Sequence, residues 1–576
     1  MNNLTISWIF LEIADLLQIK GDNPFKIRSY RQAARLLRTL DRDVRYYWEN
    51  NLLQELPGIG AALAEKINEL FETGTMAYLN QLRQEVPIRL RQLLLVPGLG
   101  PRTVNRIYQR LHVTSVQQLK VAVANKKLRS LPGLGVKSEQ EIERGLQTIE
   151  FVPEGLSLGD AFTIASDLSQ LLVQLPHVSR VEIAGQIRRR EELIQEALFL
   201  LTAPWDQAAG ILATFGSALY VREILQSNPT EIAVQLGIGL KVRLIIVNPV
   251  EFYTQICYYT GPIGHWKALV KQARQTGLEL TPSYLKDGTD FVSLRSEQDL
   301  YCYLGLEFVI PELRAGGDEV VAAQHGTLPN VISLQQVKGD LHLHTDWSDG
   351  KESILSMAKA ALNRGYQYIA ITDHSQRLKI ARGLDARRLA AQVDEIASVR
   401  KTFPDLTILT GIEVDILSDG SLDLPDWVLA KLDLVVAAVH SGFKQDKITM
   451  TKRIVVALRN PYVHILAHPS GRLIGKRLPY QVNLDTVLIE AQRQGKIMEI
   501  NASPERLDLD TNWAAKAKSV GVKLVINTDA HDSSCLADMK YGVSVARRAG
   551  LGTNHVINTW PVTHLRKVLQ SIRGET

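Results

Sequence analysis

Cysteine and long apolar runs are scarce in this chain of 576 residues. Its three cysteines, Cys257, Cys302 and Cys535, have no paired spacing, which argues against a disulfide framework and favours a reducing compartment. No apolar run is long enough to span a bilayer, and the N-terminal stretch WIFLEIADLL is interrupted by Glu12 and Asp15. We therefore expect a cytoplasmic protein that does not associate with membranes.

The chain carries a small excess of positive charge, and this excess is unevenly distributed along the sequence. The formal net charge is +5, and residues 1–150 hold 21 Lys and Arg against 15 Asp and Glu, so the excess lies at the N-terminus. A localised basic region is typical of a surface that binds polyanions. Arg28, Arg31 and Arg35 follow one another at helical spacing and are candidate DNA contacts, although a solvated helix face is the alternative interpretation.

A short turn occurs three times in the first 150 residues, as LPGIG (56–60), VPGLG (96–100) and LPGLG (131–135). Each copy precedes a helical stretch and resembles the hairpin of a helix-hairpin-helix motif. Its glycines let the backbone approach a ligand, and the following helix presents free N–H groups that suit a phosphate. Three copies predict DNA binding through the backbone, independent of sequence. The glycines concerned are Gly58, Gly60, Gly98, Gly100, Gly133 and Gly135.

The last 240 residues alternate between strand-like and helix-like segments. The strand-like segments are rich in Val, Ile and Leu without strict alternation, as expected for parallel strands buried on both faces. Regular alternation with helices predicts a β/α barrel, in which the chemistry lies at the C-terminal ends of the strands. The segments are GDLHLH, YIAIT, LTILTGIEVDI, LDLVVAAV, VHILA, KIMEI and VKLVIN.

Side chains that can bind metals gather at the ends of these predicted strands. Packed or surface histidines would be scattered, yet six of the nine histidines from position 342 onward lie at strand ends. Imidazole and carboxylate ligands without sulfur suit manganese, zinc or iron, and clustered cations would favour hydrolysis of phosphoesters. The nine candidate ligands are His342, His344, Asp349, His374, Glu413, His440, His468, Asp529 and His531.

The segments that carry these residues resemble the PHP domain, named after polymerases and histidinol phosphatase. They are GDLHLHTDWSDG, ITDHS, GIEVDI, AAVHSGF, LAHPSGRL and NTDAHD. The resemblance implies a distorted barrel with three divalent metals, Mn²⁺ favoured over Zn²⁺ or Fe²⁺. One metal would take His342, His344, Asp529 and a bridging Glu413; a second would take Glu413, His440 and His468; a third would take Asp349, His374 and His531. Catalysis would fall to Glu413, His440, His374 and His531.

The middle of the chain resembles a family X DNA polymerase, whose bacterial members carry a C-terminal PHP domain. The resemblance rests on IAGQIRRREELIQEALFLLTA, LKVRLIIV and YYTGPIGHWKALVKQARQTGLEL. It implies a multidomain chain with helical N-terminal modules, an α+β palm and thumb, and the barrel. The expected bounds are 1–85 for a helix-hairpin-helix domain, 86–150 for a fingers-like domain, 151–250 for the palm, 251–325 for the thumb, 326–338 for a linker and 339–576 for the PHP domain.

The palm departs from the family at the positions that bind metal. The family has a Gly-Ser pair and three aspartates, where this chain has Gln186, Glu196, Leu198 and Arg243. A palm needs clustered carboxylates to hold two magnesium ions. Placing a unit positive charge 4 Å from the positive charge of Arg243 costs about 4 kcal/mol at an effective dielectric constant near 20. We therefore predict that nucleotidyl transfer has been lost and that the palm and thumb remain as a scaffold.

The preferred hypothesis is a metal-dependent DNA phosphoesterase that acts as a 3′–5′ exonuclease in DNA repair. The resemblance also allows cleavage at abasic sites and removal of blocked 3′ ends, in a bacterial protein that joins the nucleoid when it binds DNA. The alternatives are an active polymerase with an associated exonuclease, a non-catalytic DNA-binding scaffold, and a small-molecule phosphatase.

Overall fold

The computed structural model describes residues 1–87, 90–94, 96, 99–149, 155–475 and 477–574. The chain forms two compact units. The first comprises residues 1–156, 161–187 and 194–259, and the second comprises residues 157–160, 188–193 and 260–576. No helix in the described ranges is long and apolar enough to cross a membrane.

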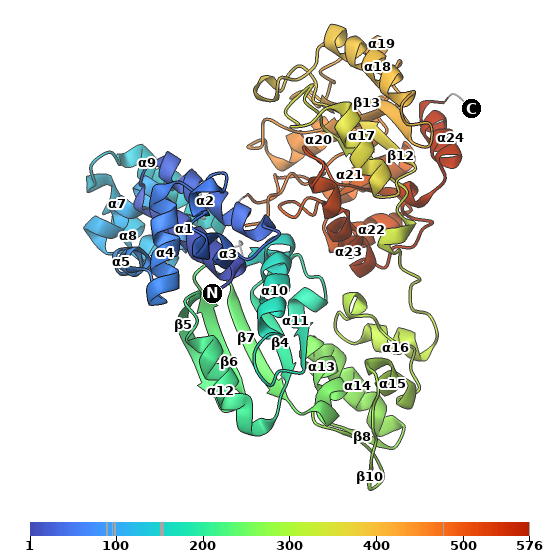
Figure 1. Cartoon of the computed structure of the whole chain (residues 1–576). Coiled ribbons are helices and arrows are strands. Elements are labelled where there is room, and N and C mark those ends of the chain that lie inside the picture. The colour runs from blue at the N-terminus through green and yellow to red at the C-terminus, as the bar shows by residue number, and fades with distance from the viewer. Residues whose placement is uncertain (88–89, 95, 97–98, 150–154, 476, 575–576) are drawn as a thin grey trace. The chain divides into compact units, whose positions relative to one another are not determined.

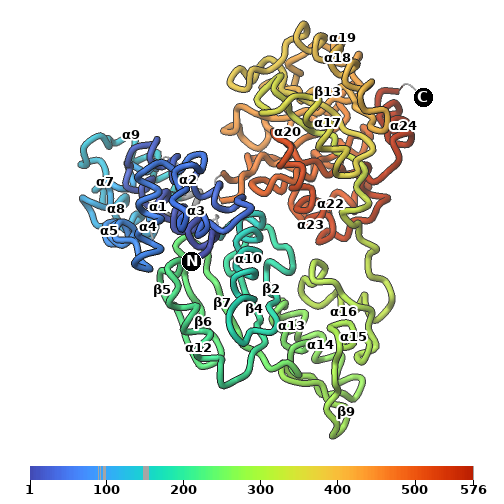
Figure 2. The backbone as a smooth tube through the Cα atoms, viewed as in Figure 1, coloured from blue at the N-terminus to red at the C-terminus, as the bar shows by residue number. Residues whose placement is uncertain are grey.

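The N-terminal part of the first unit is a helical array around one apolar core. Helices α1 (Asn3–Lys20) and α2 (Pro24–Thr39) lie side by side, as Figure 2 shows. Asn2 and Asn23 cap the two helices through their side chains, and Gly21 ends α1 in the left-handed conformation. The later helices include α4 (Ala61–Thr73), α5 (Ala77–Glu85), α7 (Pro101–Leu111), α8 (Val116–Ala124) and α9 (Val136–Ile149).

A buried carboxylate connects three elements of this unit. Glu12 of α1 is 1% exposed, and its Oε1 and Oε2 accept hydrogen bonds of 2.8 and 2.6 Å from Arg83 of α5. Arg222, in strand β5 (Val221–Asn228), lies 3.3 Å from the same carboxylate. A charge this deeply buried is tolerated only because both guanidinium groups neutralise it.

We expect Glu12→Ala to lower the free energy of unfolding by about 3 to 5 kcal/mol, because the substitution leaves two guanidinium groups without their buried carboxylate. The urea midpoint followed by circular dichroism measures the change. Glu72→Ala, at an exposed position of α4, is the matched control and should leave the midpoint unchanged. Equal midpoints for the two variants would contradict the prediction.

The remainder of the first unit is a five-stranded mixed sheet in the order β2-β4-β7-β6-β5. Its central strands β4 (Glu196–Thr202) and β7 (Lys241–Val247) run parallel, and β2 (Arg180–Ala184) and β6 (Glu231–Leu236) pair antiparallel to them. Helix α12 (Trp205–Gly216) covers one face (Figure 1). The register places Leu198 opposite Arg243, so that two of the altered palm positions are neighbours.

The second unit begins with a small helical subdomain that contains a buried ion network. Its helices are α14 (Ile263–Gln275), α15 (Glu297–Tyr303) and α16 (Asp318–Gln324). Glu297 is 2.7 Å from the guanidinium groups of both Arg188 and Arg314, and Arg314 also donates to the carbonyl oxygen of Val309. These charge-assisted bonds fix α15 against the loop that follows it.

The C-terminal part of the second unit is a nearly closed barrel of seven parallel strands, which confirms the predicted fold class. The strands follow chain order, and β11, β14 and β16 are buried along their whole length. Leu343 forms a parallel bridge with Ala530, which brings the first strand to the last. The strands are β11 (Gly339–Leu343), β12 (Tyr368–Ile371), β13 (Thr407–Asp415), β14 (Leu434–Ala438), β15 (Ile465–Leu466), β16 (Ile497–Asn501) and β17 (Leu524–Asn527).

Helices connect successive strands of the barrel, as the alternating sequence pattern predicts. Figure 1 shows several of them around the strands. The principal ones are α17 (Ile354–Asn363), α18 (Ala386–Arg400), α20 (Lys447–Leu458), α21 (Leu484–Arg493) and α22 (Thr511–Val520), and α23 (Met539–Arg548) follows the last strand. Because every crossover returns the chain to the same end of the barrel, all strands finish at one rim.

Candidate active site

The nine predicted ligands meet at the C-terminal rim of the barrel. His342 and Glu413 lie within strands β11 and β13, and the others lie in the segments that follow β11, β12, β14, β15 and β17. Three groups have all their ligand atoms within 4.8 Å of one another. The groups are His344, Asp349, His374 and His531; His342, His344 and Asp529; and His374, Glu413 and His440.

Glu413 is the centre of this arrangement. Its carboxylate is 1% exposed and contacts imidazoles from the ends of four different strands. Imidazoles beside both oxygens would let this carboxylate hold a metal together with them. The Oε1 atom is 3.5, 3.2 and 3.0 Å from the Nε2 atoms of His342, His440 and His468, and Oε2 is 3.7 Å from His344 Nε2 and 2.7 Å from His374 Nδ1.

The other two carboxylates among the nine predicted ligands are Asp529 and Asp349. Asp529 Oδ1 lies 3.0 Å from His344 Nε2, and Asp349 Oδ1 lies 3.3 Å from His531 Nε2 and 3.5 Å from His374 Nε2. The rings of His344 and His531 stack with centroids 4.3 Å apart. The structure therefore brings together every ligand that the sequence predicted, and His468 joins the set through its contact with Glu413.

Several buried ligand atoms make no hydrogen bond of suitable geometry in the described parts of the chain, although some of them lie within ion-pair distance of another member of the cluster. A buried polar atom without a partner costs about 1 to 3 kcal/mol, so a cluster of them calls for another group to satisfy them. Divalent cations would do so, because neutral imidazole nitrogens and carboxylate oxygens are their ordinary ligands. The atoms are Nε2 of His342, both ring nitrogens of His344, Nδ1 of His374, Nδ1 of His468 and Oε2 of Glu413.

Burial and neighbouring charges shift the pKa values of the predicted ligands, and metal binding would therefore be coupled to the release of protons. Burial alone would lower the pKa of His440, but Glu413 and Asp415 raise it to about 10. Burial would raise the pKa of Glu413, yet His440, His374 and His342 hold it well below its ordinary value. Burial, together with the charges of His531 and His374, lowers the pKa of His344 to about 3. Cations would therefore compete with protons for an anionic cluster.

A second layer of side chains fixes the orientation of the ligands. Glu499 Oε1 is 2.8 Å from Nδ1 of His342, and its Oε2 accepts a 2.8 Å bond from the backbone N–H of His468. Asp415 Oδ1 is 2.8 Å from Nδ1 of His440. Such partners select the ring nitrogen that faces a metal and hold it there. Asp415 was missed in the sequence, although its spacing of two residues from Glu413 places both on one face of β13.

Two arginines that the sequence analysis did not single out lie near the rim. The Nε atom of Arg506 is 3.7 Å from Oδ2 of Asp529. The guanidinium group of Arg477 lies 4.3 Å from the ring centroid of Phe443, which is three residues beyond His440. Both arginines come from irregular segments with no periodic pattern, so no sequence signal predicted where they lie.

Two of the four positions predicted as altered in the palm, Glu196 and Arg243, belong to an ion network with Lys241 and Glu231. The Glu196 carboxylate lies 2.8 Å from Nζ of Lys241 and 3.1 Å from Nε of Arg243, and Arg243 also pairs with Glu231 at 2.9 Å. Leu198 packs in the apolar core of the sheet. The side chain of Gln186 accepts the backbone N–H of Gln195 at 2.9 Å. The one acidic side chain among the four altered positions is therefore already paired with two cationic groups.

The glycine turns have the backbone geometry that the motif requires where the structure describes them. Gly58 and Gly133 have φ of 89° and 74°, in the left-handed region that favours glycine. Gly60 and Gly100 cap α4 and α7 without a side-chain hydrogen bond, which leaves the first N–H groups of each helix available. An added Cβ at Gly135 would meet nothing within 4 Å. Gly98 lies outside the described residues.

Comparison with known proteins finds four family matches along the chain. Residues 1–76 match the family described as a helix-hairpin-helix domain, and residues 90–148 match the SAM-like helix-hairpin-helix tandem. Residues 255–315 match the DNA polymerase beta thumb, and residues 340–476 match the PHP domain. These matches place both DNA-binding modules and the metal-binding barrel in families that the sequence motifs had indicated.

Individual relatives cover either the whole chain or part of it. A Bacillus subtilis protein named DNA polymerase/3′-5′ exonuclease PolX is 37% identical over 550 residues, which span 95% of both chains. A probable phosphatase of Thermoanaerobacter sp. is 33% identical over 38% of this chain and 89% of its own length. A probable phosphatase of Caldanaerobacter subterraneus is 29% identical over 41% of this chain and 91% of its own.

Tandem helix-hairpin-helix modules, a polymerase thumb and a PHP barrel in one chain define the class of DNA polymerases that are joined to a phosphoesterase domain. With identity at this level over almost its whole length, the chain belongs to the family X DNA polymerases with a C-terminal PHP domain.

Proposed function

We propose that this protein is a metal-dependent DNA phosphoesterase, with 3′–5′ exonuclease activity, that has lost nucleotidyl transfer. The observation that carries the proposal is the contrast between the two potential metal sites. Nine predicted ligands, the buried Glu413 among them, lie together at the rim of the barrel, whereas Arg243 pairs with Glu196 and Glu231 in the proposed palm. Removal of nucleotides from a DNA strand would serve repair, and the same chemistry extends to abasic sites and blocked 3′ ends.

The residues of the barrel fit the chemistry of phosphodiester hydrolysis. When bound, divalent cations supply a water of lowered pKa and screen the charge that develops on the phosphate. We assign three such ions to the nine ligands, with Mn²⁺ favoured. Asp415 and Glu499 keep the rings of His440 and His342 directed at the centre. The guanidinium group of Arg506, beside Asp529, is positioned to contact a phosphate of the bound strand.

The proposed loss of polymerase activity follows from the charges in the palm. A two-metal site needs carboxylates with free oxygens near the incoming triphosphate. Glu196 is instead paired with Lys241 and Arg243, and Leu198 contributes no oxygen. A magnesium ion here would have to displace two cationic side chains from Glu196 and would find no carboxylate at the other two aligned positions, while the neighbouring Glu231 is paired with Arg243.

A second candidate function is favoured by the names of the partial relatives, which are probable phosphatases. A small phosphate monoester would fit the same cluster of ligands. The glycine turns and the basic N-terminal region have no role in that reaction, whereas a DNA substrate uses both. If DNA is the substrate, it should inhibit hydrolysis of a small ester competitively.

The substitution His440→Ala tests the proposal. It removes a predicted metal ligand that contacts Glu413, and we expect release of nucleotides from a 5′-labelled primer–template in Mn²⁺ to fall at least about 100-fold, with DNA affinity unchanged. His564→Ala is the matched control, because this exposed histidine of the same domain stacks on Trp560 away from the ligands. Cleavage that persists in the His440 variant would refute the assignment of the site.

A further inference from the structure

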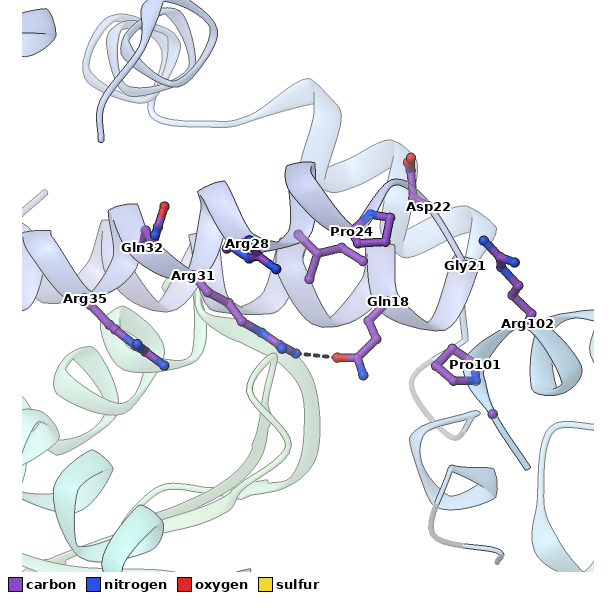
Figure 3. A pocket seen from close by; sticks show the side chains of 12 residues that line it. Gln18, Gly21, Asp22, Pro24, Arg28, Arg31, Gln32, Arg35, Pro101 and Arg102 are labelled. Carbon is purple, nitrogen blue, oxygen red and sulfur yellow. Dashed lines mark hydrogen bonds between the residues drawn. The ribbon is translucent and has the colours of Figure 1, made fainter. Parts of the chain in front are cut away.

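Arginine side chains gather at more than one place in the described parts of the chain. Arg28, Arg35 and Arg102 line a cavity between α1, α2 and α7 in the first unit (Figure 3). A separate pair, Arg477 and Arg506, lies in the second unit at the rim of the barrel. The proposed function uses only Arg506, so Arg477 lies beside the metal ligands without an assigned role.

Arg477 is held by two segments that each carry a predicted metal ligand. Its Nε atom donates a 2.9 Å bond to the carbonyl oxygen of Gly471, three residues beyond His468. Its guanidinium group lies 4.3 Å from the ring centroid of Phe443, three residues beyond His440. Because the face of an aromatic ring attracts a cation, the ring keeps the guanidinium group beside the rim.

The ring that supports Arg477 is itself fixed. Phe443 stacks with Tyr480, with the ring planes 14° apart and the centroids 6.1 Å apart. Tyr480 is buried, and its hydroxyl donates a 2.6 Å bond to the carbonyl oxygen of Pro469, which directly follows a predicted ligand. An added Cβ at Gly471 would lie 2.4 Å from the Tyr480 ring, so the backbone packs closely against it. The position of Phe443 is therefore tied to the segment that carries the ligand.

A backbone hydrogen bond joins the segments that carry the two arginines. The N–H of Ile474, three residues before Arg477, donates a 2.6 Å bond to the carbonyl oxygen of Glu505, and Arg506 is the next residue. Burial lowers the pKa of Arg477, and the positive charge of Arg506 lowers it further. The two guanidinium groups are therefore close enough for their charges to repel each other.

Protein groups neutralise the two arginines to different extents. The Nε atom of Arg506 lies 3.7 Å from Oδ2 of Asp529, a predicted ligand. Among the described residues no carboxylate forms an ion pair with Arg477, whose Nε donates to a carbonyl oxygen. An anion beside Arg477 would relieve the repulsion between the two cations, and phosphate oxygens match the fork of a guanidinium group.

The contacts of the arginines indicate which phosphate each would bind. Arg506 touches the side chain of a predicted ligand, so the phosphate within its reach is the one at the metals. Arg477 is held by residues three positions beyond the ligands, so it lies further from the metals. A nucleotide chain supplies a second anionic phosphate one nucleotide away from the first, whereas a small ester has only one.

We propose that Arg477, supported by the ring of Phe443, binds the phosphate next to the scissile one, so that the site selects a nucleotide chain over a small ester. The inference deepens the proposed function, on which it rests for the reaction. Phe443 acts through Arg477 and is a positioning residue.

Two short substrates that differ by one phosphate test this inference. TpT has one phosphodiester and TpTpT has two, so removal of the 3′ nucleotide from TpTpT leaves the second phosphate in the product TpT. In each reaction water forms the new bond to phosphorus, the bond to the 3′ oxygen breaks, and that oxygen takes up a proton. Initial rates in Mn²⁺, followed by liquid chromatography, give KM and kcat for the full-length protein.

We expect Arg477→Gln to raise the KM for TpTpT about tenfold, as the loss of one charge-assisted hydrogen bond predicts. The kcat should change less than about twofold, because the contact is made equally in the ground state and in the transition state. The KM for TpT should also change less than about twofold. Equal increases for both substrates would place Arg477 at the scissile phosphate and overturn the proposal, as would an unchanged KM for TpTpT.

Arg493→Gln is the matched control. Arg493 lies in the last turn of α21, which leads into the start of β16 at the end of the barrel opposite the rim. Its substitution makes the same chemical change in the same domain and should leave both KM values at the wild-type level. Circular dichroism confirms that each variant is folded. A rise in the KM for TpTpT that equals that of the Arg477 variant would mean that the effect is one of overall charge, which overturns the proposal.

A double-mutant cycle measures the part played by Phe443. Phe443→Leu should raise the KM for TpTpT about threefold, because the guanidinium group loses its support, and should add nothing in the Arg477→Gln background. Phe443→Tyr keeps an aromatic face and should restore the wild-type value. Independent effects of the two substitutions would mean that the ring contacts the DNA directly, which would overturn its role as a positioning residue.

A binding measurement separates this inference from the proposed function. Fluorescence anisotropy of 5′-labelled TpTpT, with Ca²⁺ in place of Mn²⁺, gives affinity without hydrolysis. If the wild-type protein hydrolyses neither substrate, the proposed function fails, but about tenfold weaker binding by Arg477→Gln would still support the contact to a second phosphate. Equal affinities of the variant and the wild type would overturn that contact even if hydrolysis occurs.

Discussion

The substitution Glu413→Gln is expected to slow removal of nucleotides from a 3′ end by about a thousandfold or more, equivalent to about 4 kcal/mol of transition-state stabilisation. Glutamine keeps the shape of the side chain but loses the negative charge that five imidazoles surround. A neutral amide would hold divalent cations less tightly than a carboxylate, so we expect the protein to lose at least one of the three metals proposed for this site. Single-turnover cleavage in Mn²⁺ and elemental analysis after dialysis measure the two effects.

Glu490→Gln is the matched control for this prediction. It makes the same chemical change in the same domain, on α21, where Glu490 is 2.8 Å from Arg459 and takes no part in the ligand cluster. We expect its cleavage rate and metal content to equal those of the wild type. A Glu413→Gln protein that kept both properties would show that the cluster is not the hydrolytic centre.

The second large effect is an absence of primer extension. With all four deoxynucleotides and either Mg²⁺ or Mn²⁺, we expect no product longer than the primer, because Arg243 and Lys241 neutralise Glu196 where the palm would bind metal. The assay should use the Glu413→Gln background, so that degradation from the 3′ end cannot conceal slow extension. The Bacillus subtilis relative, which is named as a polymerase, serves as the positive control.

Addition of even a single nucleotide by the Glu413→Gln protein would contradict this prediction. It would mean that carboxylates outside the four altered positions hold the metals. A direct measure is Mn²⁺ binding to the same protein, since a palm without a site leaves only the ions of the barrel. Additional bound Mn²⁺ that the substitution Glu231→Gln removed would locate such a site beside Arg243.

Much of the barrel could be predicted from the sequence because local patterns carried the information. Parallel strands buried on both faces give short apolar runs, and their C-terminal ends meet at one rim whatever the details of the connections. Residues that follow such runs, such as His374 and His468, could therefore be grouped before any contact was known. The glycine turns were equally local in the sequence, but only the structure shows that Gly58 and Gly133 have positive φ whereas Gly60 and Gly100 do not.

Other features depended on contacts between segments far apart in the chain. The sequence predicted Arg243 as a charge that repels metal, but its pairing with both Glu196 and Glu231 follows from the register of three strands. Arg506 lies beside Asp529 because an irregular loop after β16 reaches the next strand end. Neither position follows from spacing, since loop paths depend on tertiary packing.

The sequence by itself determined the barrel, and it predicted the set of candidate metal ligands and the glycine turns, because each follows from residue type and short-range periodicity. Only the tertiary structure decided that Glu413 is the common neighbour of five imidazoles, that the palm is closed by an ion network, and that Arg28, Arg35 and Arg102 share one cavity. The physical reason is that distances between side chains of separate elements depend on strand register, barrel curvature and helix packing, which act only when the whole chain is folded.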